Sequence, residues 1–511
     1  MINFNKISNV EDLTFVSKKI MPRDKFKEFD TYFNPKNVAI IGASKKRGFW
    51  WINSLVQAGF QGKIYPINPK INSYLGITFY KSILEVPDDI IDYVIISIPK
   101  QYIIQALKEC FQKKARVVTI FTSGFSETGI KEDFESEMKI KEMIIDNGYK
   151  TRVIGPNCMG LYVPGKIHFN YSLPRKQGSV SFLSQSGGLA QNVSYKLGTL
   201  GIGLAKVVSF GNQVDLDVTD FLEYLTDDRH SKFICMYLEG LKKEKSRKFF
   251  DILRQTTLKK PVLLWQGGQT EEGARAATTH TGAIKGSLGS QKMWQAIQKQ
   301  TGLIHAHNFD DLINTVVFFD YYNFKKNKNL KGRVCIISIS GGVSVVYTDI
   351  LAKHGLKIPK LHEDTIERLK KTFDYQVGNS MNNPVDLASD FFNFGGLQEI
   401  FKSISEDRNT DCIIFELNIQ YTRVEDPYFV EMNQWIKFYY KRIKEALLEI
   451  KNNGKPVIFI IPVITFLHKL IDDWSYFQTD FPIYMNIESA ATALSNFISY
   501  KEYYFRNKKE D

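Results

Sequence analysis

Short apolar runs alternate with amphipathic stretches through the first third of the chain. An uninterrupted apolar run is typical of a strand in a parallel sheet, because helices cover both of its faces. Apolar residues at helical spacing, such as those over 103–111, separate the runs. Strands and helices that alternate in this way predict a doubly wound parallel sheet. The runs occupy residues 37–41, 63–67, 93–98 and 117–121.

The same alternation returns twice further along the chain. A second set of apolar runs covers 180–183, 206–210, 233–238 and 262–266, and a third covers 334–339, 412–415 and 456–461. The pattern predicts an α/β protein with three doubly wound parallel-sheet domains, without a fixed short repeat period. The lysine-rich segment 323–329 is the expected linker. The predicted parts are a lead-in over 1–34 and domains over 35–164, 165–323 and 324–511.

A small-residue turn, Gly42-Ala43-Ser44, follows the first strand. Glycine lets the chain turn sharply there, and the next helix would direct its N-terminal N–H groups at a phosphate. The spacing to Gly48 gives only part of a dinucleotide-binding fingerprint. A plain strand-to-helix turn therefore remains an equal alternative on this motif alone.

Ligands of doubly wound sheets bind outside the carboxyl ends of the strands. Further residues of the first domain are expected around the same crevice. They are Asn68, Pro69, Ile98, Pro99, Ser123, Gly124 and Asn157.

The second domain carries three features suited to phosphoryl transfer. The turn Ser184-Gln185-Ser186-Gly187-Gly188 places hydroxyl and N–H groups at a helix start, which favours an anion. Glu239 ends another strand. His280 lies among small residues over 276–287, which predicts an exposed loop that can approach a ligand. On the loop alone, a surface histidine without a role is the alternative.

Composition narrows the class of protein. The chain has 511 residues, 43% hydrophobic and 24% charged, with a net charge of +12. Its lysines are dispersed, and the run Lys45-Lys46-Arg47 is interpreted as solvated surface, so no nucleic-acid partner is predicted. The charge would help attract polyanionic small molecules such as nucleotides or coenzyme A. The sequence has no apolar run of membrane-spanning length, no N-terminal signal core and no metal-ligand pairing among five scattered cysteines. These features predict a cytoplasmic protein that has no membrane partner and no metal site of its own.

The order of the motifs resembles the NDP-forming acyl-CoA synthetases, the superfamily of succinyl-CoA synthetase and ADP-forming acetyl-CoA synthetase. The resemblance covers nearly the whole chain after about residue 33. Its motifs, in order, are GAS at 42–44, YPINP at 65–69, GPNCMG at 155–160, SQSGG at 184–188, FGNQVDLD at 210–217, YLEG at 237–240, ARAATTHTGAIKGS at 274–287, NPVDL at 383–387 and FPIY at 481–484.

This resemblance implies a fold, a reaction and roles for the residues. The first domain would be a Rossmann-like CoA-binding domain, and the other two would be flavodoxin-like domains of the succinyl-CoA synthetase type. CoA would contact Gly42, Ala43 and Ser44, and the turn at 184–188 would bind phosphate. His280 would be transiently phosphorylated and held by Glu239. The reaction would interconvert acyl-CoA, phosphate and ADP or GDP with acid, CoA and ATP or GTP through an acyl phosphate.

No stretch of the sequence resembles an ATP-grasp domain, so the chain resembles an α-type subunit. The resemblance implies a heteromer in which an ATP-grasp β-type subunit holds the nucleotide with Mg²⁺. One departure concerns the CoA turn, because Phe49, Trp50 and Trp51 place bulky rings where the family often has smaller residues.

Two other functions fit parts of the sequence. A nicotinamide-dependent oxidoreductase would need an acidic residue near the end of the second strand, and residues 67–70 contain none. A CoA-binding regulatory protein that kept the fold without turnover is the second alternative. The presence of both His280 and Glu239 argues against it.

Overall fold

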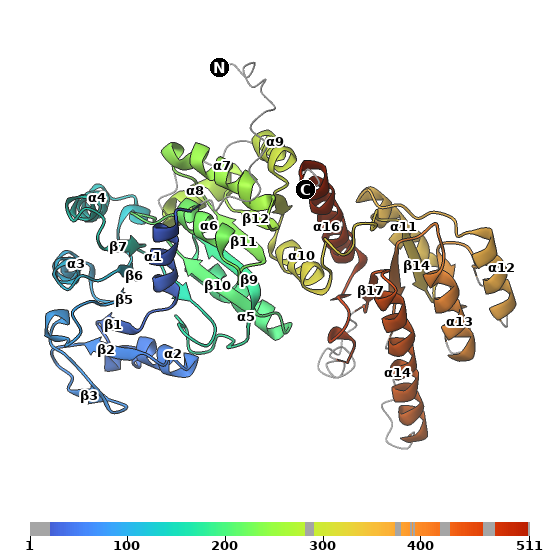
Figure 1. Cartoon of the computed structure of the whole chain (residues 1–511), viewed down its shortest axis with the longest axis horizontal. Coiled ribbons are helices and arrows are strands. Elements are labelled where there is room, and N and C mark those ends of the chain that lie inside the picture. The colour runs from blue at the N-terminus through green and yellow to red at the C-terminus, as the bar shows by residue number, and fades with distance from the viewer. Residues whose placement is uncertain are drawn as a thin grey trace, which may run out of the picture. The chain divides into compact units, whose positions relative to one another are not determined.

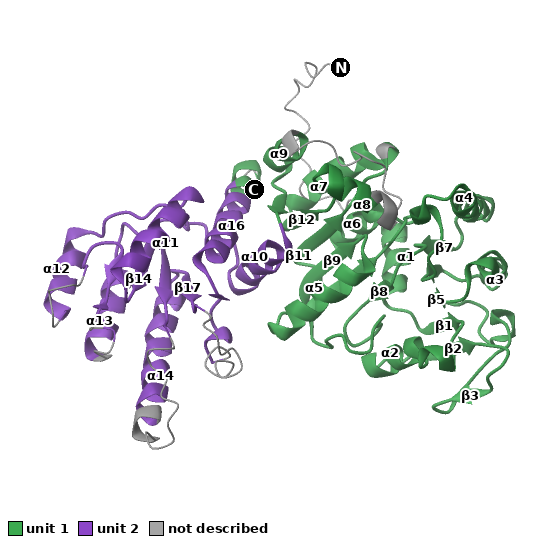
Figure 2. Ribbon diagram, turned by 180° about the vertical axis from the view of Figure 1, so that it is seen from behind, with its two compact units in different colours: residues 1–307, 503–511 green, residues 308–502 purple. Residues whose placement is uncertain are grey.

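The computed structural model describes residues 21–281, 291–373, 380–388, 391, 394–418, 430–462 and 476–508. The chain forms two compact units, residues 1–307 with 503–511 and residues 308–502 (Figure 2). Each unit is an α/β structure in which helices lie on both faces of parallel sheets (Figure 1). The predicted fold class is therefore confirmed.

The first sheet of unit 1 has five parallel strands in the order β2-β1-β5-β6-β7. The strand order reverses between β1 and β5, and ligands bind such sheets at this switch point. The strands are β1 (Asn37–Ile41), β2 (Lys63–Ile67), β5 (Tyr93–Ile96), β6 (Val117–Ile120) and β7 (Arg152–Ile154). The main helices are α2 (Trp50–Ala58), α3 (Ile103–Gln112) and α4 (Lys131–Asp146), and a small hairpin joins β3 (Ser73–Tyr74) to β4 (Ile77–Thr78).

The second sheet of unit 1 has six strands in the order β13-β12-β11-β9-β10-β8. Its switch point lies between β9 and β11, and β8 is an antiparallel edge strand. The strands are β8 (Gly160–Tyr162), β9 (Gln177–Ser184), β10 (Leu204–Ser209), β11 (Phe233–Leu238), β12 (Val262–Gln266) and β13 (Ile304–Ala306). The helices are α5 (Gly187–Thr199), α6 (Val218–Asp227), α7 (Ser246–Thr257), α8 (Glu271–Thr281) and α9 (Gln291–Thr301).

The lead-in contributes one helix, α1 (Arg23–Phe33), that packs through aromatic side chains. The ring of Phe33 stacks on Tyr224 of α6 at 5.1 Å between centroids, and Phe29 meets Phe221 edge to face at 6.0 Å. Burial of several aromatic rings contributes strongly to packing energy. The lead-in is therefore attached to the second sheet's helix layer.

Unit 2 contains a five-stranded parallel sheet in the order β15-β14-β16-β17-β18. The unit begins at Asn308, before the predicted linker, because α10 packs on α16 through rings such as Phe318 and Phe497, whose centroids lie 4.9 Å apart. The strands are β14 (Val334–Ser338), β15 (Val385–Asp386), β16 (Cys412–Glu416), β17 (Val457–Ile460) and β18 (Ile483–Tyr484). The helices are α10 (Phe309–Tyr321), α11 (Gly341–Lys353), α12 (Glu363–Thr372), α13 (Phe394–Ser405), α14 (Val430–Asn452) and α16 (Ile487–Asn507).

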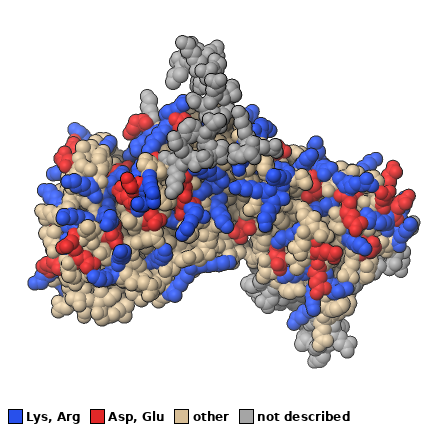
Figure 3. All heavy atoms as spheres, in the orientation of Figure 1, with Lys and Arg blue, Asp and Glu red and all other residues tan. Residues whose placement is uncertain are grey.

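Charged side chains of both signs are interleaved over the face drawn in Figure 3. This distribution agrees with the dispersed lysines of the sequence. In the part of the chain that the structure describes, none of the helices is both long and apolar enough to cross a bilayer.

Candidate functional site

The turn after β1 requires glycine at position 42, because there is no room for a side chain. Its φ is +97°, and a Cβ there would lie 2.4 Å from the carbonyl oxygen of Ser97. The Gly42 N–H donates to the Ile67 carbonyl at 3.0 Å, and the Asn68 amide donates to the Ala43 carbonyl at 2.8 Å. The turn is therefore held between the ends of β2 and β5, as a ligand-binding turn at a switch point requires.

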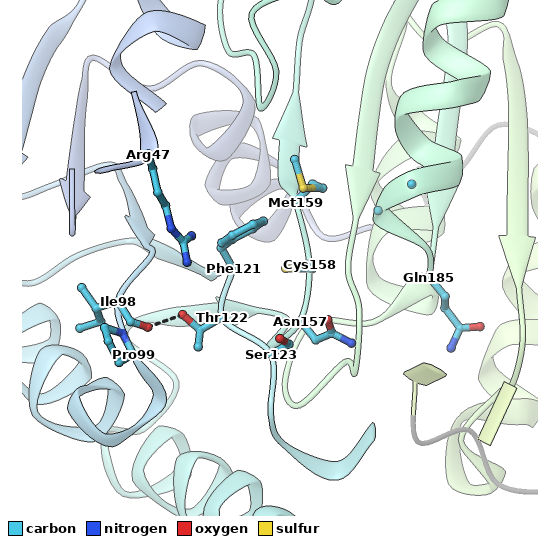
Figure 4. A pocket seen from close by; sticks show the side chains of 12 residues that line it. Arg47, Ile98, Pro99, Phe121, Thr122, Ser123, Asn157, Cys158, Met159 and Gln185 are labelled. Atoms are coloured by element: carbon cyan, nitrogen blue, oxygen red, sulfur yellow. Dashed lines mark hydrogen bonds between the residues drawn. The ribbon is translucent and has the colours of Figure 1, made fainter. Parts of the chain in front are cut away.

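A pocket of about 530 Å³ lies where the first two sheets of unit 1 meet (Figure 4). It brings together predicted residues from both domains. From the first domain come Ile98, Pro99, Ser123 and Asn157, and from the second come Gln185, Gly187 and Gly188. Arg47, Phe121, Thr122, Cys158 and Met159 complete the described lining.

The remaining predicted CoA residues are not among the described residues that line this pocket. Gly42, Ala43 and Asn68 form the hydrogen-bonded turn, and Ser44 precedes the 3₁₀ turn η2 (Lys45–Arg47). Pro69 follows Asn68 at an exposed position. The φ of Gly124 is +99°, and its N–H donates to Glu127 Oε1 at 2.5 Å.

The start of α5 forms one wall of the pocket. Ser186 is the N-cap, and its hydroxyl accepts a hydrogen bond from the Leu189 N–H at 3.4 Å. The hydroxyl of Ser184 is used inside the turn, where it donates to the Ser186 carbonyl at 2.7 Å. A Cβ on Gly187 would lie 2.8 Å from Met159 Cγ, so glycine allows the helix start to approach that side chain closely. The N–H groups and positive end of a helix favour an anion at this wall.

Gln185 connects this wall to Glu239. Its amide oxygen accepts hydrogen bonds from the backbone N–H groups of Glu239 and Gly240. Because the oxygen is engaged, the amide NH₂ group is the part of the side chain that can donate to a ligand. The side chain that lines the pocket thus also fixes the backbone at the end of β11.

Glu239 is buried, with 8% of its surface exposed. Burial, and then the neighbouring Glu239 carboxylate, raise the pKa of the Tyr237 phenol. A Cβ on Gly267 would lie 3.2 Å from Glu239 Cγ, so this carboxylate packs beside the segment that leads from β12 into α8. Glu239 is therefore adjacent to the chain that continues to His280.

The predicted loop around His280 is wrong up to Thr281, because that stretch is the helix α8. The Thr270 hydroxyl accepts a hydrogen bond from the Gly273 N–H at 3.0 Å, and the alanines that follow are strong helix formers. The helix packs against η5 (Ser126–Thr128) of the first domain. The imidazole of His280 and residues 282–290 lie outside the described part.

Two sets of polar contacts join the domains beside the pocket, and sequence reasoning did not find either. The Asn212 amide donates to Glu127 Oε2 at 2.6 Å and to Glu137 Oε2 at 2.8 Å. Arg152 forms a two-point ion pair with Asp215, with N–O distances of 2.9 and 2.7 Å. Only the 210–217 motif pointed to this region, and it did not identify the acceptors. The contacts tie β7 and α4 to the turn before α6.

The two tryptophans after the predicted CoA turn are not among the described residues that line the pocket. Trp50 donates its indole N–H to the Phe169 carbonyl at 2.8 Å. Trp51 is buried and contacts the ring of Phe121 edge to face, with centroids 5.3 Å apart. Trp51 therefore supports the wall formed by Phe121, and neither tryptophan is among the described lining residues.

Comparison with known proteins finds a matching family for each of two segments of the chain. Residues 36–164 match the CoA binding domain, and residues 177–319 match the succinyl-CoA ligase like flavodoxin domain. The chain is 35% identical over 440 residues to the acetate–CoA ligase [ADP-forming] II subunit alpha of Pyrococcus furiosus, covering 84% of this chain and 89% of that protein.

Longer relatives and solved structures agree. The acetate–CoA ligase [ADP-forming] of Methanocaldococcus jannaschii is 36% identical over 70% of this chain, which spans 48% of that protein. A dinucleotide-forming acetyl-coenzyme A synthetase 1 of Ca. Korarchaeum cryptofilum, solved with phosphate and ADP, superposes with a TM-score of 0.77 at 27% identity, covering 94% of this chain and 99% of that one. The chain therefore belongs to the NDP-forming acyl-CoA synthetase family and corresponds to its α-type subunit.

Proposed function

We propose that this chain acts as the α-type subunit of an acid–CoA ligase that works through an acyl phosphate and a phosphohistidine. The observation that carries the proposal is the shared pocket, in which predicted CoA residues of the first domain face the start of α5. A thioester held by the first domain would thus lie beside an anion held by the second. Placing two reactants in one site lowers the barrier to their reaction.

In the first step, an oxygen of phosphate attacks the thioester carbonyl. The C–S bond breaks, CoA leaves as its thiolate, and an acyl phosphate remains. The N–H groups of Gly187 and Gly188 are available to the phosphate oxygens, and the Gln185 amide NH₂ group supplements them.

In the second step, the His280 imidazole attacks the phosphorus atom, and the carboxylate of the acid leaves. A histidine nucleophile divides the transfer into two easier steps. Glu239 accepts a hydrogen bond from the other ring nitrogen, which selects the tautomer and stabilises the positive charge that develops. The position of Glu239 beside the chain leading into α8 supports this role.

The phosphoryl group then passes to ADP or GDP. We assign the nucleotide and Mg²⁺ to an ATP-grasp β-type subunit, and the relatives named as alpha subunits support a separate partner. Transfer to a nucleotide needs cations arranged around its phosphates. The 511-residue chain by itself should therefore proceed no further than the phosphohistidine.

Labelling of the purified chain with radioactive phosphate tests the proposal. Wild type should acquire an acid-labile, base-stable label that depends on one of acetyl-CoA, succinyl-CoA or 4-hydroxybutyryl-CoA. His280→Ala should lose that label while retaining CoA binding. A regulatory protein would bind CoA without any acyl-CoA-dependent label, and a label that persists in His280→Ala would reject the assignment of the nucleophile.

A further inference from the structure

Arg47 occupies the switch point of the first sheet. It ends η2, which follows β1 after the turn at residues 42–44, and its Nη1 atom donates to the hydroxyl of Ser97 at 3.0 Å. Ser97 follows β5, the strand beside β1 where the strand order reverses. The guanidinium group therefore spans the two strand ends between which ligands of such sheets bind.

One aromatic ring orients this guanidinium group, and a second ring supports the first. It lies 5.6 Å from the centroid of the Phe121 ring, and Phe121 is supported by the buried ring of Trp51. A guanidinium group stacked on an aromatic face is held in plane with little loss of its donor capacity. The side chain is thus positioned before a ligand arrives, although it is exposed to solvent.

The charge of Arg47 is distinctive in this pocket. Among the twelve described residues that form the lining, Arg47 is the only charged one (Figure 4). The hydrogen bond that orients it goes to a hydroxyl group, so its charge is not neutralised there. Among the described residues, one hydrogen bond uses one of its five N–H groups, which leaves four for a ligand, enough for two-point binding of an oxyanion.

The start of α5 and Arg47 give one pocket two features that attract anions. The start of α5 suits the reacting phosphate of the proposed function, and Arg47 suits another anionic group on the same ligand. We infer that Arg47 binds an oxyanion of the acyl-CoA substrate, either a phosphate of its CoA part or a carboxylate at the far end of its acyl group. This inference rests on the proposed function.

Calorimetry with Arg47→Gln separates the two sources. The matched control is Lys46→Gln, which removes the neighbouring exposed charge from outside the described lining. Each protein is titrated with CoA, pantetheine, acetyl-CoA and succinyl-CoA, and its fold is checked by thermal unfolding. Loss of a charged hydrogen-bond partner is expected to weaken binding by roughly 10- to 100-fold.

If the source is a CoA phosphate, Arg47→Gln weakens CoA and both thioesters and leaves pantetheine unchanged. If the source is an acyl carboxylate, only succinyl-CoA is weakened. Equal binding of all four ligands by wild type and Arg47→Gln overturns the inference, as does an equal loss in Lys46→Gln. Absence of CoA binding by wild type would instead reject the proposed function, and the inference with it.

Discussion

Replacing Gly42 with alanine places a methyl group where the chain has no room for one. The new Cβ would lie 2.4 Å from the Ser97 carbonyl oxygen and 2.6 Å from Ile98 Cγ2. The Ser97 carbonyl follows β5 in the backbone, so it cannot move without displacing Ile98, which lines the pocket. Gly48 provides the matched control, because its φ is +58° and its Cβ would meet nothing within 4 Å.

Both substitutions place a side chain on backbone with a positive φ, but only one of them also introduces a steric clash. An L-residue at positive φ costs about 1–2 kcal/mol. Only Gly42→Ala adds overpacking, which costs about 1–3 kcal/mol in a well-packed interior. Gly42→Ala should therefore destabilise unit 1 by about 2 kcal/mol more than Gly48→Ala.

Urea unfolding followed by circular dichroism measures this difference. With a slope of about 2 kcal/mol per M, the first transition of Gly42→Ala should occur about 1 M lower than that of Gly48→Ala. CoA affinity should fall with it, because Ser97 and Ile98 would be displaced. Equal midpoints and equal affinities would refute the argument that contact with β5 dictates glycine at this turn.

Three further substitutions test the site and its support. Glu239→Gln keeps the shape of the side chain and removes its charge, so phosphoryl transfer should slow by roughly 100-fold or more while CoA affinity stays unchanged. A wild-type rate would show that the carboxylate has only a structural role. Asn212→Ala removes the amide that donates to both Glu127 and Glu137, so unit 1 should lose about 1–3 kcal/mol of stability. Thermal unfolding measures this loss, and an unaltered midpoint would show that the contact does not stabilise the unit. Burial lowers the pKa of His168 to about 4. The imidazole of the unfolded chain binds a proton below about pH 6.5, whereas the folded protein binds it only near pH 4. The free energy of unfolding is therefore highest above about pH 6.5 and decreases toward pH 4, by about 2 kcal/mol at pH 5. His168→Phe should reduce the dependence of the unfolding midpoint between pH 7 and 5 and leave the part due to His305, whose pKa burial also lowers to about 4. An unchanged slope would contradict this assignment.

The sheets were predictable because their determinants are local. Strands such as β1 and β14 are uninterrupted apolar runs followed by small-residue turns, and such runs specify buried parallel strands without reference to partners. A general rule about strand ends placed the Ile98 segment and the Gln185 turn each at the carboxyl edge of its own sheet, whereas only the structure shows that the two meet in one pocket.

Other features were not predictable because their determinants are ambiguous or distant. The small residues before His280 were interpreted as a loop, although alanine is also the strongest helix former, and α8 is the outcome. The first domain was expected to extend over residues 35–164, yet β8 begins at Gly160 within that range and pairs with β10 of the second sheet. Arg47 belongs to a charged run typical of solvated surface, and only the fold brings Ser97 and Phe121 to it.

The position of Gln185 gives the site a physical connection between the two steps of the proposed reaction. One amide group lines the pocket with its side chain and accepts two backbone hydrogen bonds at the end of β11. A phosphate that receives a hydrogen bond from the NH₂ end would fix the same amide whose oxygen holds the backbone of Glu239. Ordering of that amide would then also order the backbone at Glu239, because a buried N–H group that loses its acceptor costs about 1–3 kcal/mol. In the proposed mechanism, the step on phosphate and the step on histidine therefore share one side chain, Gln185.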